Sequence, residues 1–179
     1  METCFGYHGA YIICDATHGT SQRRIVHEDI YRQFPGGSAL GTHLLMEHQA
    51  WQHDPLSPDS SIVFAFSPLV GSPLTTSAKF AVVSRSPLTG RLNDSLASST
   101  FALAGKRTGH DAIVITGKAP QPSIIVIDDQ SVQMLPADDL WGLSAAEAET
   151  KLRSRFGSDF HFAVIGPAGE RMVRYATIS

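Results

Sequence analysis

The sequence predicts an α+β fold in which two related mixed β-sheets carry helices packed on their outer faces. Short apolar runs bounded by proline and glycine are typical of buried strands, and they recur along the 179 residues. Hairpins are mixed with single helices, which favours α+β over a doubly wound parallel sheet. The two halves of the chain also share one order of elements, which indicates an internal duplication.

The proposed duplication rests on the order hairpin, acidic turn, helix, apolar strand, Pro-Gly turn and strand. This order describes residues 11–83 and again residues 123–178, and it sets residues 64–68 opposite residues 162–167. The alternative is that any α+β domain gives such an outline by chance.

One sequence motif occurs twice in the first half of the chain. An apolar run, at residues 62–66 and again at 80–83, leads into Ser-Pro-Leu-x-Gly at residues 67–71 and 86–90. The proline lacks an N–H group and ends ladder pairing, whereas the glycine permits a positive φ. Several strands of one core are therefore expected to end in similar turns, where a fold can present backbone amides to a ligand.

The remaining elements follow from local patterns. Strands are predicted as hairpins at residues 11–26 and 123–135, as a single strand at 111–117, and as closing strands at 161–165 and 172–178. Helices are predicted at residues 28–34, 38–49, 94–107 and 144–156. Ser38 is expected to cap the second helix, Asp94 or Ser95 the third, and Ser144 with Glu147, as a capping box, the fourth.

Composition indicates a globular protein of one domain, residues 1–179. Apolar residues make up 42%, charged residues 17%, and the formal net charge is −3, so nothing indicates a nucleic-acid or membrane surface. No apolar run could span a bilayer and no signal-peptide pattern occurs, so we expect a cytoplasmic protein. Cys4 and Cys14 are interpreted as a terminal and a buried thiol, too few for a four-cysteine cluster.

A series of short motifs occurs in a fixed order along nearly the whole chain. They are Gly6-Tyr7-x-Gly9, Pro35-Gly36-Gly37-x-Ala39-Leu40-Gly41, Asp54-Pro55-Leu56-Ser57-Pro58, the two Ser-Pro-Leu-x-Gly turns, Gly109-His110-Asp111-Ala112-Ile113-Val114, Gly117-Lys118-Ala119, Leu140-Trp141-Gly142 and Ile165-Gly166-Pro167-Ala168-Gly169-Glu170. In this order they resemble the N-terminal domain of the aldehyde ferredoxin oxidoreductase family.

The resemblance implies a part of an enzyme that oxidises aldehydes to carboxylic acids and passes electrons to ferredoxin. Such enzymes hold tungsten, or sometimes molybdenum, on two pterin dithiolenes beside a [4Fe-4S] cluster. The N-terminal domain is the two-sheet base under the pterins, and later domains supply the cluster cysteines and the substrate pocket. The chain is thus expected to need a C-terminal oxidoreductase portion or subunit, and to reach ferredoxin only indirectly.

The resemblance also names cofactor-binding candidates, with no catalytic or metal-ligating residue among them: Lys79, Asp94, Ser95, Ser98, Gly71 and Gly90. Lys79 stands where the family has an arginine at the pterin and the cluster. The two glycines would offer backbone groups to the cofactor, and Asp94 and Ser95 match the family. A solvated lysine, two turn glycines and a helix cap are the structural alternatives.

The sequence departs from the family pattern at several of these positions. Ser38 replaces an arginine, Leu96 an asparagine, and Ser98 and Ser99 a pair of glycines, and the cluster-ligand region of the family would lie beyond Ser179. Two hypotheses follow. The chain is the pterin base of a split or truncated oxidoreductase, or it is a non-catalytic, degenerate relative that serves as a binding or scaffold module. An uncovered apolar face would also permit a homodimer.

Two further groups of residues have simple interpretations. Arg85 and Arg91 flank the second turn, either as surface arginines or as anion ligands. His43, His48 and His53 recur every five residues, whereas metal ligands on one helix face need a spacing of three or four, so no histidine metal site is expected.

Overall fold

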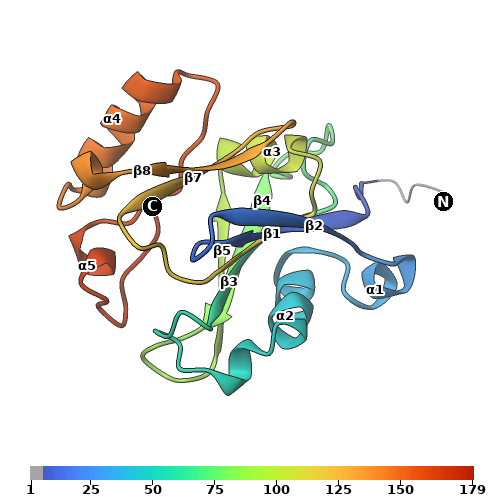
Figure 1. Ribbon diagram of the computed structural model, residues 1–179. Coiled ribbons are helices and arrows are strands. Elements are labelled where there is room, and N and C mark those ends of the chain that lie inside the picture. The colour runs from blue at the N-terminus through green and yellow to red at the C-terminus, as the bar shows by residue number, and fades with distance from the viewer. Residues whose placement is uncertain (1–5) are drawn as a thin grey trace.

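The computed structural model describes residues 6–179 and shows an α+β architecture with two sheets (Figure 1). Cys4 lies outside the described residues. The larger sheet has six strands in the order β2-β1-β6-β3-β4-β5, and β7 and β8 form the smaller one. The strands are β1 (Ala10–Asp15), β2 (Thr20–Ile25), β3 (Ser61–Phe66), β4 (Lys79–Arg85), β5 (Leu92–Ser98), β6 (Ala112–Thr116), β7 (Ser123–Ile127) and β8 (Val132–Pro136).

The larger sheet is mixed, as predicted. Strands β1 and β6 pair in parallel, and each other neighbouring pair in this sheet is antiparallel. The smaller sheet is a two-stranded antiparallel hairpin instead of a second mixed sheet. The fold class and the predicted hairpins are therefore confirmed, while the second half of the chain contributes fewer strands than expected.

Helices cover the larger sheet from both sides (Figure 1). They are α1 (Glu28–Gln33), α2 (Gly37–Glu47), α3 (Thr100–Arg107), α4 (Ala145–Phe156) and α5 (Pro167–Glu170), with short 3-10 turns η1 (Ala50–Gln52) and η2 (Asp138–Leu140). Side chains of α1 and α2 join one apolar cluster with the sheet, and those of α3, β7 and β8 join another on the opposite face. Successive side chains of a strand point to opposite faces, so each central strand contributes to both clusters.

Helix α2 approaches the sheet closely because Gly41 has no side chain. A Cβ atom at Gly41 would lie 2.5 Å from Cγ2 of Val83 on β4. Leu40, Leu44 and Leu45 of this helix are buried, as their spacing predicted. Gly41 thus lets the helix pack onto β3 and β4, where its nearest neighbours are Ala65 and Val83.

The prediction of a helix beginning at Asp94 or Ser95 is wrong. Residues 92–98 form strand β5, paired in full register with β4, and α3 begins only at Thr100 with Ser99 as its N-cap. Asn, Asp and Ser have low β propensity and favour helix caps. Pairing with β4 overrides that local preference.

Two boundary predictions also need correction. Helix α2 begins at Gly37 with Gly36 as its N-cap, so Ser38 lies inside the helix and its hydroxyl donates to Asp94 instead. The closing strands predicted at residues 161–165 and 172–178 are wrong except for one bridge between Ile165 and Ile178, and residues 167–170 between them form α5. The capping box of Ser144 and Glu147 at α4 is confirmed.

Candidate functional site

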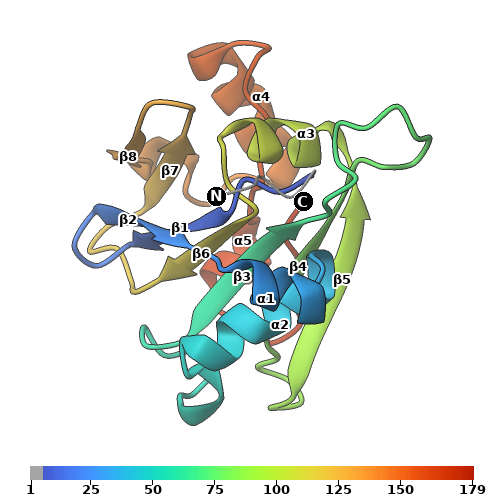
Figure 2. The same cartoon turned by 90° about the vertical axis from the view of Figure 1, so that its right-hand side faces the viewer.

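The cofactor-binding candidates lie around the β4–β5 ladder, at the edge of the larger sheet (Figure 2). All seven residues of β5 are exposed, and in the described sheet this strand has β4 as its single neighbour. Exposed edge strands present unpaired backbone N–H and C=O groups. The edge can therefore contact a ligand or another polypeptide along its whole length.

Three candidates share one face of this ladder. Lys79 pairs with Ser98, and Asp94 pairs with Val83, which packs on α2. Since paired residues and alternate residues of a strand lie on the same face, these three side chains lie on the α2 face. The Ser38 hydroxyl donates to Asp94 Oδ2 at 2.6 Å, which ties the middle of the strand to α2.

Lys79 and Ser98 form the polar end of that face. Lys79 is exposed at the first residue of β4, and within residues 6–179 its ammonium group makes no hydrogen bond or ion pair. Gly71 belongs to the loop of residues 67–78 that leads into β4 at this same end, and has a φ of 84°. The structure thus places an unpaired ammonium group and a hydroxyl at one end of the ladder, whereas Gly71 follows Val70, which packs in the cluster on the α3 face.

Ser95 and Gly90 lie elsewhere. Ser95 pairs with Val82, whose side chain packs on the opposite cluster, so Ser95 faces the α3 side. Gly90 lies in the turn between β4 and β5, at the far end of β4 (Figure 2). Seven residues of strand separate the ends by about 20 Å. The two Ser-Pro-Leu-x-Gly turns therefore do not converge on one point.

The donors at the Lys79 end suit one phosphate-like group. A phosphate is bound by a cation and hydrogen-bond donors, which the Lys79 ammonium and the Ser98 hydroxyl supply. Leu96 lies on the same face, opposite Ala81, is 68% exposed, and supplies neither charge nor side-chain hydrogen bond. The groups at this end of β5 therefore suit an anion of the size of one phosphate.

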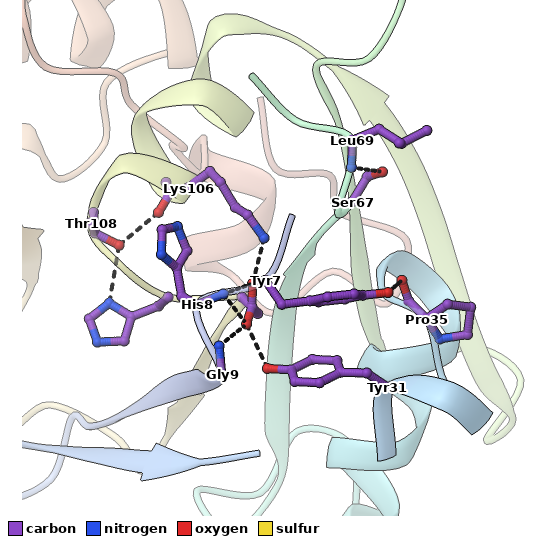
Figure 3. A network of polar contacts seen from close by, with 12 residues as sticks. Tyr7, His8, Gly9, Tyr31, Pro35, Ser67, Leu69, Lys106 and Thr108 are labelled. Carbon is purple, nitrogen blue, oxygen red and sulfur yellow. Dashed lines mark hydrogen bonds and ion pairs between the residues drawn. The ribbon is translucent and has the colours of Figure 1, made fainter. Parts of the chain in front are cut away.

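A buried polar cluster around Asp111 was not predicted from the sequence (Figure 3). The Asp111 carboxylate is 1% exposed and accepts hydrogen bonds from the backbone N–H groups of His8, at 2.9 and 3.1 Å, and Gly9, at 2.9 Å. It also accepts a hydrogen bond from the Tyr31 hydroxyl, 2.6 Å from Asp111 Oδ2, and forms an ion pair with the Lys106 ammonium. The cluster joins the segment before β1 to α1, α3 and the start of β6.

The electrostatics of this cluster indicate a structural role. Burial, followed by the hydrogen bond to Asp111, raises the pKa of the Tyr31 hydroxyl well above its ordinary value, so it stays a donor. Burial, aided by Arg23, lowers the pKa of the neighbouring His110. With four donors on its two oxygens the carboxylate of Asp111 is saturated. It therefore anchors the segment before β1 to α1 and α3.

The same region positions the first Ser-Pro-Leu-x-Gly turn. The Asp111 carbonyl accepts the N–H of Phe66, the last residue of β3, at 2.9 Å. Pro68 of the turn lies against Gly36, where a Cβ atom would be 2.7 Å from the proline Cδ. Gly36 has a φ of 115°, which favours glycine. The turn that carries Gly71 is thus set by packing on α2 as well as by its own sequence.

The second turn is held by Arg85. Its Nε donates to the Gly90 carbonyl at 2.8 Å, and Nη1 donates to the carbonyls of Trp51 and His53. Arg91 is exposed beside it. Arg85 therefore joins the turn to the loop after α2, which is more than a surface arginine does.

The three histidines at five-residue spacing lie in separate surroundings. His43 stacks on Phe34 at 4.7 Å between ring centroids, and His48 packs edge-on against Tyr11 at 6.1 Å. Within residues 6–179 no group of three or more potential ligands is placed to hold a metal ion.

Cys14 is buried, and burial raises the pKa of its thiol to about 11.

His48 is expected to make the fold less stable at acidic pH. Its Nε2 is buried without a partner in the described structure, and burial lowers the pKa of its imidazole. Because the unfolded chain takes up a proton at a higher pH, the stability contributed by neutral His48 is lost as the pH falls below about 6.5. Thermal unfolding from pH 8 to pH 5 should show a smaller loss of melting temperature in His48→Gln. The control His53→Gln should behave like the parent, and equal losses in all three proteins would contradict the assignment.

Comparisons with known proteins agree with this architecture. The family described as "Aldehyde ferredoxin oxidoreductase, N-terminal domain" matches residues 11–179. The tungsten-containing aldehyde ferredoxin oxidoreductase of Pyrococcus abyssi is 34% identical over 176 residues, which are 97% of this chain and 29% of that protein. The aliphatic sulfonate oxidoreductase, WOR-like subunit, of Pyrococcus furiosus is 28% identical over 190 residues, covering 97% of this chain and 30% of the relative.

The fold is also similar to that of a solved structure. The active-site complex BamBC of benzoyl coenzyme A reductase with 1,5-dienoyl-CoA contains a chain that matches with a TM-score of 0.92 and 26% identity, covering 98% of this chain and 27% of that one. The present chain thus spans less than a third of the length of these relatives. No described helix is both long and apolar enough to cross a membrane. The chain belongs to the aldehyde ferredoxin oxidoreductase family and corresponds to its N-terminal domain.

Proposed function

We propose that this chain is the pterin-base domain of a tungsten or molybdenum oxidoreductase that oxidises aldehydes to carboxylic acids with ferredoxin as acceptor. The observation that carries the proposal is the polar end of the β4–β5 ladder, where Lys79 is exposed and unpaired beside Ser98. Supporting it, the P. abyssi relative is named as tungsten-containing and aldehyde-oxidising. The remainder of the enzyme would come from a C-terminal portion or subunit.

The family includes other substrates, so the aldehyde assignment rests on similarity. Relatives are named for aliphatic sulfonates and for glyceraldehyde 3-phosphate, and the similar structure belongs to a benzoyl coenzyme A reductase. The aldehyde ferredoxin oxidoreductase of P. abyssi is 34% identical against 28% for the sulfonate enzyme, over the same share of this chain. We therefore favour an aldehyde substrate.

The role of this chain in the proposed enzyme is to bind and orient. When bound, a tungsten or molybdenum bis-pterin would supply the two-electron chemistry, and the iron–sulfur cluster would be held by the partner portion. Lys79 would neutralise a pterin phosphate as a point charge, without the bidentate geometry of arginine. Ser98 would donate a hydrogen bond, and the backbone of Gly71 would approach the cofactor without steric hindrance.

Replacing Lys79 tests the proposed seat. In the chain co-produced with its C-terminal oxidoreductase portion, Lys79→Ala should reduce retained pterin and metal about tenfold after desalting, because one charge-assisted contact is lost. Lys79→Arg should retain or increase both. Lys118→Ala removes an exposed lysine beyond β6 and serves as the control. Full retention of pterin in Lys79→Ala would show that this end of β5 does not hold the cofactor.

A second function is favoured by Leu96. It lies between Asp94 and Ser98 on the same face and is 68% exposed. An apolar surface thus stands at the position where the family resemblance implies an asparagine. A non-catalytic relative that binds another polypeptide at β5 would have this property. Such a protein would purify without pterin or metal even together with its partner portion, and Lys79→Ala would leave partner binding unchanged.

A further inference from the structure

A cavity lies at the end of the β4–β5 ladder opposite to Lys79, next to the turn of residues 86–91. Its volume is ≈ 170 Å³, and Leu45, Met46, Trp51 and Leu92 are the large apolar residues of its lining. Three of them are unusually exposed for apolar side chains: Met46 at 54%, Trp51 at 56% and Leu92 at 49%. The cavity is therefore an open apolar recess with a tryptophan at its rim.

Arg85 gives this recess one fixed positive charge. Three backbone carbonyls hold its Nε and Nη1, so the guanidinium cannot turn away from the recess. Within residues 6–179 its second terminal nitrogen, Nη2, makes no hydrogen bond. Nη2 lies 3.8 Å from the position that a Cβ atom of Gly90 would occupy, and Gly90 lines the recess. Two N–H donors thus remain for a ligand at an already oriented cation.

We propose that this recess binds a small apolar carboxylate, with the carboxylate on Nη2 of Arg85 and the hydrocarbon against Met46, Trp51 and Leu92. Size supports this class of ligand. A protein cavity of about 150 Å³ holds benzene, whereas cofactor and drug-sized ligands occupy about 300–1,000 Å³. A single aromatic ring or a short branched chain fits, and a pterin or nucleotide does not.

The recess is separate from the proposed pterin seat and does not depend on it. The recess is about 20 Å from the Lys79 end of β4, so a carboxylate bound here would not occupy the pterin seat. Carboxylic acids are also the product class of the proposed reaction, and the size and charge of the recess favour this class whatever that reaction is. Because Arg85 bridges the turn and the loop after α2, occupancy is expected to stiffen the loop of residues 51–53.

A ligand series tests the charge requirement on the unmodified chain. Benzoate titrated into the isotope-labelled protein should shift the side-chain N–H signals of Arg85 and Trp51 saturably, with a Kd on the order of 1 mM, as expected for so small a ligand. Benzamide and benzyl alcohol keep the ring and lose the charge, and both should bind at least about tenfold more weakly. Equal binding of benzamide would overturn the role of Arg85, and the absence of a saturable shift would overturn the site.

A matched pair of variants tests the location. Met46→Trp enlarges an exposed side chain that lines the recess, and Met172→Trp makes the same change at a methionine that is 59% exposed and outside its lining. Benzoate affinity should fall at least about tenfold in the first variant and stay unchanged in the second. Unchanged affinity in a folded Met46→Trp would mean that benzoate binds elsewhere, which contradicts the proposal.

Discussion

Asp111→Ala is expected to destabilise the fold by about 3–5 kcal/mol, because it leaves the buried Lys106 ammonium without its counter-charge. Lys106 is 8% exposed, and the substitution also removes the acceptor of the Tyr31 hydroxyl and of two backbone N–H groups. A typical domain is stable by about 5–15 kcal/mol in total. The variant should therefore lie near the limit of folding.

Urea unfolding of three proteins checks this prediction. Asp94→Ala is the control, since its exposed carboxylate accepts one hydroxyl in the described structure, and it should change stability by no more than about 0.5 kcal/mol. The double variant Asp111→Leu with Lys106→Met removes both charges and should recover part of the loss. A loss below about 1 kcal/mol in Asp111→Ala would mean that the ion pair is not buried as described.

Gly105→Ala is expected to cost about 1–3 kcal/mol, even though alanine is the better helix former. The added methyl group would overlap the ring of Phe66, which is 1% exposed and cannot move outward. Alanine gains about 1 kcal/mol over glycine in a helix interior. The overlap opposes this gain because α3 must move away from β3 or the ring must leave its packing position.

A double-mutant cycle separates the two effects. Phe66→Leu shortens the side chain where the new methyl group would lie, so Gly105→Ala should be less harmful in that background than in the parent. The coupling free energy should be about 1 kcal/mol or more. Stabilisation by Gly105→Ala in the parent would show that α3 does not approach β3 closely.

The most apolar elements of the fold were predictable from sequence. Strands β3 and β6 are continuous apolar runs, and the capping box at Ser144 is a local signal, so both periodicity and capping identified them. Strand β5 was missed because Asn93, Asp94 and Ser95 favour a helix cap. Its conformation is set by the ladder with β4, which no local pattern of residues 92–98 reveals.

The candidate site was predictable only in part, for a similar reason. The order of the motifs identified Lys79 and Ser98, which pair across β4 and β5. It also grouped Ser95 and Gly90 with them as cofactor-binding candidates, although these two residues lie elsewhere. Alternation along β5 and the length of β4 separate these residues. The Asp111 cluster offered a weak signal, a carboxylate at the start of an apolar strand, which needs a buried partner. Lys106, five residues earlier, becomes that partner only through the turn after α3.

The most direct test of the proposed function is metal and pterin analysis of the chain purified anaerobically together with its C-terminal oxidoreductase portion. The pterin-base proposal predicts that tungsten or molybdenum, pterin and iron all co-purify with the pair, and that Lys79→Ala lowers pterin and tungsten or molybdenum. A stable, colourless pair that contains neither metal nor pterin would contradict it and would favour the binding or scaffold module.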